Sequence, residues 1–359
     1  MGVYIPMSLE SLGRSRFSIT PSVEIIAGLR AYGSARPSRH LARWRTRAER
    51  SMSGPQLALL RGLVPDSHAY VPDFLSPPPA RSRASIEETV AQVAATPVDE
   101  VAYHLDIAYK GRRIRPDVAD SFGGDGPFDA WRRELPPAVE AALASGPATF
   151  AARVADAMAA YFTAAIEPDW ADVLDVLQAD VAYRGARMAR LGAIALLDDL
   201  SPDVRWDSHG LRLSRPFNVL VDWADDGLLL IPSTADGRRV SFCAERPVTP
   251  SVIYPVRGVW RLWTSDRHDP RPAVADLIGE TRAGLLASLD HPRSTGELSR
   301  ARSLAPATVS YHLGILHRSG LVHRRRLGRT VVYERAPIAD DLLSGEVGSW
   351  TAGEAAQAN

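Results

Sequence analysis

The stretch ATVSYHLGILHRSGLVHRRRLGRTVVYE, residues 307–334, decides the fold of the C-terminal part of this 359-residue chain. In its first half Val309, Leu313 and Leu316 recur at steps of three and four residues, which places them on one face of a helix. The glycine that follows this pattern is a C′ signal, where a helix ends. The spacing therefore predicts a helix over residues 306–319.

The face of this helix opposite the apolar stripe is small and polar. It carries Ala307, Tyr311, Gly314 and Arg318, with Thr308 and Ser310 on its flanks. A helix that enters the major groove of DNA, about 12 Å wide, needs such a face because small residues permit close approach. Hydroxyl and aromatic groups on that face can reach base edges and phosphates. We therefore predict a recognition helix with Tyr311 at the centre of its contact face.

The second half of the stretch predicts a β-hairpin. Residues 321–335 form two β-prone arms around a turn that contains glycine. The arginines of this hairpin are Arg324, Arg325, Arg326 and Arg329. A basic hairpin beside a recognition helix is a wing, positioned for phosphates of the DNA backbone or minor groove. The alternative is a merely solvated hairpin, which the preceding recognition-helix pattern disfavours.

Two further helices are predicted upstream. One amphipathic helix has the stripe Val274, Leu277, Ile278, Thr281, Leu285 and Leu289. Ser294 and Glu297 then have the spacing of a capping box, so a second, short helix should start there and bury Leu298 and Ala301. With the recognition helix and the hairpin, these elements predict a winged helix-turn-helix domain over residues 272–338.

This C-terminal run resembles the winged-helix domain of the ArsR/SmtB family of bacterial regulators, in which the pattern TVSxHLxxLxxxGLVxxRRxGRxxxY recurs. The resemblance covers about 65 residues. It implies a homodimer that binds an inverted repeat of double-stranded DNA and usually represses transcription until an inducer arrives. By position it assigns recognition-helix contacts to Thr308, Ser310, Tyr311 and His312, and wing contacts to Arg325, Arg326 and Arg329.

Two features depart from that family's pattern. The residue that opens the recognition helix is Ala305, where serine is common, a loss of N-capping worth about 1 kcal/mol. The helix over residues 295–303 also lacks the cysteine pairs that bind arsenic or cadmium in founding members. Because Cys243 is the only cysteine, we expect no thiol metal site. No cofactor is expected either. A small organic effector or a partner protein is the expected inducer.

The longer N-terminal part is similar to a group of large ArsR-like regulators in which a domain of unknown function precedes the winged helix. The similar stretches are LALLRGLV…YVPDFLSPPP, ADVAYRGARMARLG, VRWDSHGLRL and YPVRGVWRLW. Residues 1–200 predict a mostly helical domain for effector binding or dimerisation, and 201–265 a small antiparallel sheet that completes it. Residues 264–272 have the composition of a linker and 344–359 that of a flexible tail. The predicted fold class is mainly α with a small β-containing middle region and a C-terminal winged helix-turn-helix.

Composition indicates which partners and which compartment to expect. The formal net charge is zero, yet residues 272–336 hold ten arginines and five acidic residues, a charge of +5. No apolar run approaches the ~18 residues of a membrane span, and the first twenty residues lack a secretory signal. With a single cysteine, these features predict a soluble, cytoplasmic protein with no membrane partner.

Other functions were weighed against DNA binding. The sequence has no phosphate-binding glycine loop, nucleophile elbow or HExxH helix, so we expect no enzyme activity. His312, His317 and His323 do not share one helix face, which favours structural or DNA-proximal roles over a metal site. Cys243 lies where a small buried hydrophobe is expected. Two alternatives stay open: a winged helix used for protein interaction, and an enzyme with an unrecognised N-terminal active site.

Overall fold

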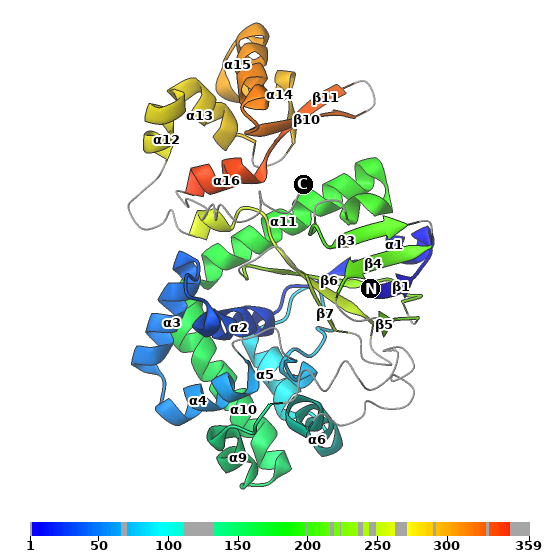
Figure 1. The fold of residues 1–359 in the computed structure, drawn as a ribbon, viewed down its shortest axis with the longest axis vertical. Coiled ribbons are helices and arrows are strands. Elements are labelled where there is room, and N and C mark those ends of the chain that lie inside the picture. Colours follow the sequence, from blue (N-terminus) through cyan, green and yellow to red (C-terminus); the bar gives the residue numbers. More distant parts are fainter. Residues whose placement is uncertain are drawn as a thin grey trace, which may run out of the picture. The chain divides into compact units, whose positions relative to one another are not determined.

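The computed structural model divides the chain into two compact units, residues 1–257 and 258–359 (Figure 1). The residues it describes are 2–65, 70–110, 133–197, 200–207, 209–215, 219–222, 224–235, 240–243, 249–262, 271–289, 292–327 and 330–344. The linker predicted at 264–272 and the tail predicted at 344–359 lie almost wholly outside these residues. The predicted domain limits stay predictions, and each unit is described by itself.

Helices make up most of the first unit. They are α1 (Leu9–Gly13), α2 (Pro21–Arg30), α3 (Arg39–Ser51), α4 (Gly54–Leu63), α5 (Ile86–Ala94), α6 (Val98–Leu105), α9 (Pro137–Leu143), α10 (Pro147–Tyr161) and α11 (Trp170–Leu191). Short turns of 3-10 or π geometry adjoin them at Ala31–Gly33, Asp73–Leu75, Asp106–Lys110, Phe162–Ile166, Glu167–Asp169 and Ala193–Leu196. Apolar residues at helical spacing drive the packing: Phe150, Val154 and Met158 of α10 are buried. Helix α10 packs against α4 and α5.

Two four-stranded sheets complete this unit. Their strands are β1 (Gly2–Pro6), β2 (Arg16–Phe17), β3 (Val204–Asp207), β4 (Gly210–Ser214), β5 (Val219–Leu220), β6 (Leu229–Ser233), β7 (Ser241–Cys243) and β8 (Ser251–Pro255). The strand orders are β3-β4-β1-β5 and β2-β6-β8-β7. Both sheets are mixed, because β1 pairs with β5, β2 with β6 and β6 with β8 in parallel.

The prediction of one small antiparallel sheet was therefore wrong. Strands β1 and β2 come from the first seventeen residues and pair with strands about two hundred residues later. In the register of β1, Ile5 lies opposite Leu211, and both side chains are buried. A strand of two to five residues whose partner is distant has little local signal, so its pairing is decided by burial in the folded unit.

Buried polar groups join the helices of this unit to β6 and the residue after it. The carboxylate of Glu24, on α2, accepts hydrogen bonds from the backbone N–H (3.0 Å) and the hydroxyl of Thr234. His40 Nε2, on α3, donates to the Thr234 carbonyl at 3.1 Å. Burial raises the pKa of Glu24, and it lowers the pKa of His40 from 6.5 to about 4. Neutral His40 can therefore accept from Ser38 at Nδ1 while it donates at Nε2.

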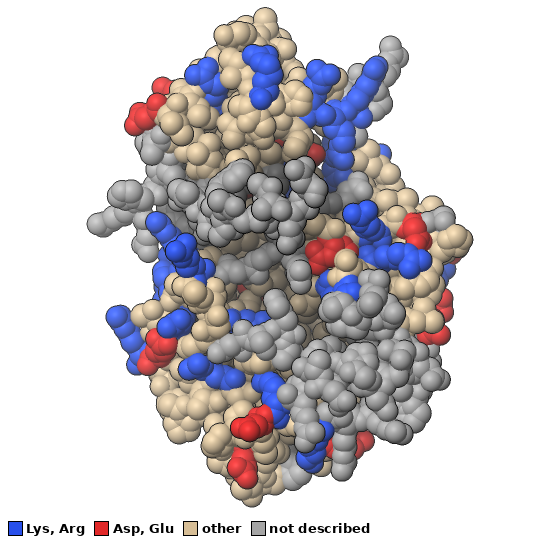
Figure 2. All heavy atoms as spheres, in the orientation of Figure 1, with Lys and Arg blue, Asp and Glu red and all other residues tan. Residues whose placement is uncertain are grey.

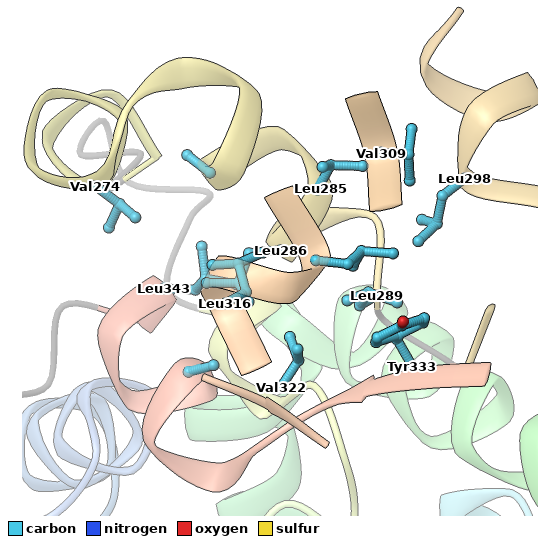
Figure 3. Packing of buried hydrophobic residues seen from close by; sticks show 13 residues of the cluster. Val274, Leu285, Leu286, Leu289, Leu298, Val309, Leu316, Val322, Tyr333 and Leu343 are labelled. Atoms are coloured by element: carbon cyan, nitrogen blue, oxygen red, sulfur yellow. The ribbon is translucent and has the colours of Figure 1, made fainter. Parts of the chain in front are cut away.

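The second unit contains short helices and a three-stranded sheet. Its elements are α12 (Arg271–Ile278), α13 (Glu280–Ala287), β9 (Arg293–Ser294), α14 (Thr295–Arg302), α15 (Pro306–Arg318), β10 (Val322–Leu327), β11 (Thr330–Arg335) and α16 (Pro337–Ser344), after a 3-10 turn at Val259–Leu262. The sheet order is β10-β11-β9, with antiparallel pairing throughout. Side chains from all the helices meet in one apolar core, as Figure 3 shows for Leu285, Leu298, Val309, Leu316 and Leu343.

One predicted helix of this unit is two helices. Gly279, with φ of +86°, separates α12 from α13, and the continuous helix predicted from Val274 to Leu289 was wrong. Glycine adopts this left-handed region without the steric cost that a Cβ would bring. The break leaves Leu277 with 72% of its surface exposed, although it was predicted to lie on the buried stripe. Ala301 is exposed as well, and Leu304 beyond the next turn packs against the core.

The predicted fold class is confirmed: the described residues are mainly helical, with small sheets, and the C-terminal unit is a winged helix-turn-helix. Among the helices that the structure describes, none is both long enough and apolar enough to span a membrane.

Candidate nucleic-acid interface

The first helix of the helix-turn-helix is fixed by its cap. Ser294 Oγ accepts from the Glu297 backbone N–H at 3.3 Å, and the Glu297 carboxylate accepts from the Ser294 N–H at 2.7 Å. This reciprocal arrangement is the capping box predicted from the sequence. Helix α14 ends at Arg302, and the C-cap Ser303 has a φ of 53°, the one left-handed value found among described residues other than glycine. That conformation turns the chain sharply into α15.

The second helix, α15, lies within one residue of its predicted bounds and is anchored by its apolar stripe. Val309, Leu313 and Leu316 are buried in the core of the unit, as predicted. At its C-terminus the Leu321 N–H donates to Leu316 (2.9 Å) and the Gly320 N–H to the carbonyl three residues before it (3.1 Å). These two bonds, with φ of +73° at Gly320, form a Schellman motif. The C-terminal end of the stripe is thereby held in place.

The opposite face of α15 points away from the core. Tyr311 is 66% exposed, and Ala307, Thr308, Ser310 and Arg318 are exposed too. Gly314 and His312 are half-buried, and Gly314 has no side chain to block close approach. The rings of Tyr311 and His312 lie edge to face, with centroids 5.2 Å apart. All six predicted contact residues of α15 thus lie on or beside one surface, although their contact with DNA stays a prediction.

His317 has a structural position. Its Nδ1 donates to the Val322 carbonyl at 3.1 Å, which ties the end of α15 to the first residue of β10. No group of three or more His, Cys, Asp or Glu that could hold a metal ion occurs among the described residues. Through its hydrogen bond to Val322, His317 helps set the angle between α15 and the hairpin.

The hairpin β10–β11 carries the predicted wing arginines on alternating faces. In its register Arg324 lies opposite Tyr333, Arg325 opposite Val332 and Arg326 opposite Val331. Arg324 and Arg326 are exposed, whereas Arg325 is half-buried. Arg329, the fourth predicted wing contact, lies outside the described residues. In Figure 2, arginine side chains, drawn in blue, gather around the hairpin and α15.

Sequence reasoning missed two partners of the wing. Glu334 lies 3.7 Å from the Arg325 guanidinium, which the cross-strand register could have indicated. Helix α16 extends the domain to Ser344, and its Asp340 pairs with the buried Arg335 at 3.0 Å. Of the ten arginines counted in the domain sequence, Arg335 thus serves the core. The apolar Leu342 and Leu343 were the available signal for this last helix.

Comparison with known proteins agrees with this geometry. Residues 277–325 match the family model described as a helix-turn-helix domain. A similar solved structure is that of reduced HlyU from Vibrio cholerae, at 28% identity over 22% of this chain and 88% of that chain, with a TM-score of 0.18. No curated protein matches the chain. The C-terminal unit is therefore a helix-turn-helix domain of the DNA-binding kind, with a basic hairpin as its wing.

Proposed function

We propose that the protein is a transcription regulator of ArsR-like type, and a repressor, which binds an inverted-repeat operator through α15 and the β10–β11 wing. The observation that carries this proposal is the exposed polar face of α15 beside a hairpin with exposed Arg324 and Arg326. The helix would enter the major groove, where Tyr311 and the neighbouring hydroxyl groups reach base edges. The wing arginines would contact phosphates, which orient the domain without reading sequence.

The proposal includes a homodimer. Leu277 of α12 and Ile338 of α16 are exposed by 72% and 46%, and these two helices pack against each other. Burying such side chains against a second copy would remove apolar surface from water and bring two recognition helices together. A two-fold dimer reads half-sites about one helical turn, ~10 bp, apart or a multiple of it.

The dimer has its own test. We expect Leu277→Asp to weaken self-association at micromolar concentration, measured by sedimentation equilibrium, with little change in stability because the side chain is exposed. Leu9→Asp, an exposed position in the other unit, is the control. A Leu277→Asp protein that remains as dimeric as the parent would show that the dimer uses another surface.

The first unit would sense the inducer, and that inducer would not be a thiophilic metal. Soft ions such as arsenite and cadmium need two or more thiolates, and one chain supplies only Cys243. That residue, on β7, is half-buried. A small organic effector or a partner protein would release DNA by binding one dimer geometry better than the other. The proposal also holds that the protein acts in the cytoplasm and has no catalytic activity.

The metal part of the proposal is tested on the DNA complex. Arsenite, cadmium and zinc are titrated in turn into the protein bound to its operator, and we expect no release at stoichiometric metal. Release that disappears in Cys243→Ser would overturn the non-metal inducer.

The central test is recovery of genomic DNA bound by the intact protein, followed by anisotropy titration of the recovered site and a scrambled duplex. We expect the recovered site to be pseudo-palindromic and its affinity to fall steeply with salt, as counterions are released from the phosphates. Binding that is insensitive to salt would contradict the proposed interface. A protein that captures other proteins and no duplex would favour a winged helix used for protein interaction.

A further inference from the structure

The three consecutive wing arginines have different surroundings because side chains alternate across a strand. Arg324 and Arg326 share the face of Val322, which is buried against the core together with Tyr333 of β11. Arg325 points to the other face, where Val332 lies opposite it. The hairpin therefore presents two of its arginines on one side and one on the other.

Arg325 also has an acidic neighbour. Its Nη2 lies 3.7 Å from a carboxylate oxygen of Glu334, and the two side chains are 35% and 21% exposed. Glu334 follows Tyr333 on β11 and is diagonal to Arg325 in the register, so both belong to the same face. A pair that is partly withdrawn from water is screened by salt less than an exposed pair. Glu334 can thus offset the charge of Arg325 at the salt concentrations where DNA binds.

We infer that Glu334 sets the strength of the wing's contact with DNA: it holds Arg325 away from DNA phosphate and so limits affinity for DNA of any sequence. Arg324 and Arg326 supply the phosphate contacts on the other face. The inference rests on the proposed DNA binding and concerns the sequence-independent part of it. Because phosphate contacts read no sequence, Glu334 would lower the affinity for operator and unrelated DNA alike.

The test is a double-mutant cycle on the full chain, with a labelled duplex of arbitrary sequence and fluorescence anisotropy between about 50 and 200 mM salt. We expect Glu334→Gln to tighten binding about 3-fold at the low-salt end and to steepen the salt slope by about one. Arg325→Ala alone should change the affinity little, because its charge is already offset. Arg324→Ala should weaken binding about 3-fold.

The double variant Arg325→Ala/Glu334→Gln separates this mechanism from simple repulsion between Glu334 and DNA. If Glu334 acts through Arg325, the gain of Glu334→Gln disappears when Arg325 is absent. A gain that persists in the double variant, or that Asp276→Asn on α12 reproduces, would overturn the inference. Asp276 is exposed, and its substitution by Asn removes one negative charge at another place in the domain. A parent protein that binds no duplex at all would instead refute the proposed function.

Discussion

The two units differ in how far apart along the chain their contacting residues lie. In the C-terminal unit the described sheet partners and the residues of its apolar cluster lie between Val274 and Leu343. In the N-terminal unit β1 and β2 pair with strands about two hundred residues later, and α2 contacts the end of β6 through Glu24 and Thr234. Local sequence patterns therefore predict the fold of the C-terminal unit well and that of the N-terminal unit poorly.

The units also place their charges differently. Arg324 and Arg326 of the wing are exposed, where they can meet a partner, whereas the N-terminal unit buries an ion pair between Asp180 and Arg184 of α11 at 2.8 Å. Asp180 also accepts from the Arg257 backbone N–H, and the Arg184 guanidinium stacks over Tyr254. Removing one member of such a buried pair is costly because the other charge stays in a poor solvent. The buried pair supports structure in the N-terminal unit, whereas exposed Arg324 and Arg326 of the C-terminal unit are proposed contacts with DNA.

The strongest way to break the comparison is to remove a long-range contact. We expect Ile5→Ala, in β1, to destabilise the N-terminal unit by about 2–5 kcal/mol because its side chain is 1% exposed. The wing domain should be unaffected. Hydrogen exchange followed by mass spectrometry reports the two units separately, and Leu9→Ala at an exposed position is the control. Equal loss of protection in both units would mean that they unfold together.

Acid should act on the N-terminal unit through His40. Its folded-state pKa of about 4 lies below the unfolded value of 6.5, so the unfolded state binds more protons between these values. The stabilisation is complete above pH 6.5 and is lost as the pH falls toward 4, roughly 3 kcal/mol in all. We expect the free energy of unfolding of the parent to fall with acid by this amount relative to that of His40→Gln. Burial raises the pKa values of Glu24 and Asp73, so these groups act in the opposite direction; both proteins contain them, and the comparison cancels their effect. Parallel urea stabilities of the two proteins from pH 7 to 4.5 would refute it.

The next test concerns recognition of DNA bases by Tyr311, in the C-terminal unit. Tyr311→Ala should erode discrimination between the operator and a scrambled duplex by about 1–3 kcal/mol if the ring or hydroxyl contacts bases. Stability should hardly change because the side chain is 66% exposed. Competition anisotropy measures both affinities. An equal loss on both duplexes would place Tyr311 on the phosphates and shift the recognition surface along α15.

The smallest expected effect comes from supplying the missing N-cap of α15. Ala305 has the extended conformation of an N-cap but no side chain that accepts a hydrogen bond. Ala305→Ser should stabilise the wing domain by about 1 kcal/mol, since its hydroxyl can accept from the Thr308 N–H. Thermal unfolding shows the gain, and Ala305→Val at the same position should show none. No gain with serine would mean that another group already satisfies that N–H.

The sequence by itself determined the winged helix because each of its signals is local. The capping box at Ser294, the stripe of Val309, Leu313 and Leu316, and Gly320 specify their own elements within a few residues. The repeat of 3.6 residues per turn carries this information along a single helix.

Only the tertiary structure decided the rest. It assigned Gly279 to a break between helices, paired Arg325 with Glu334, and placed residues 2–6 between β4 and β5. A five-residue strand cannot encode which distant strand it will meet, because pairing depends on the burial that both strands reach in the folded unit. The free energy that selects those partners exists only once the chain is compact.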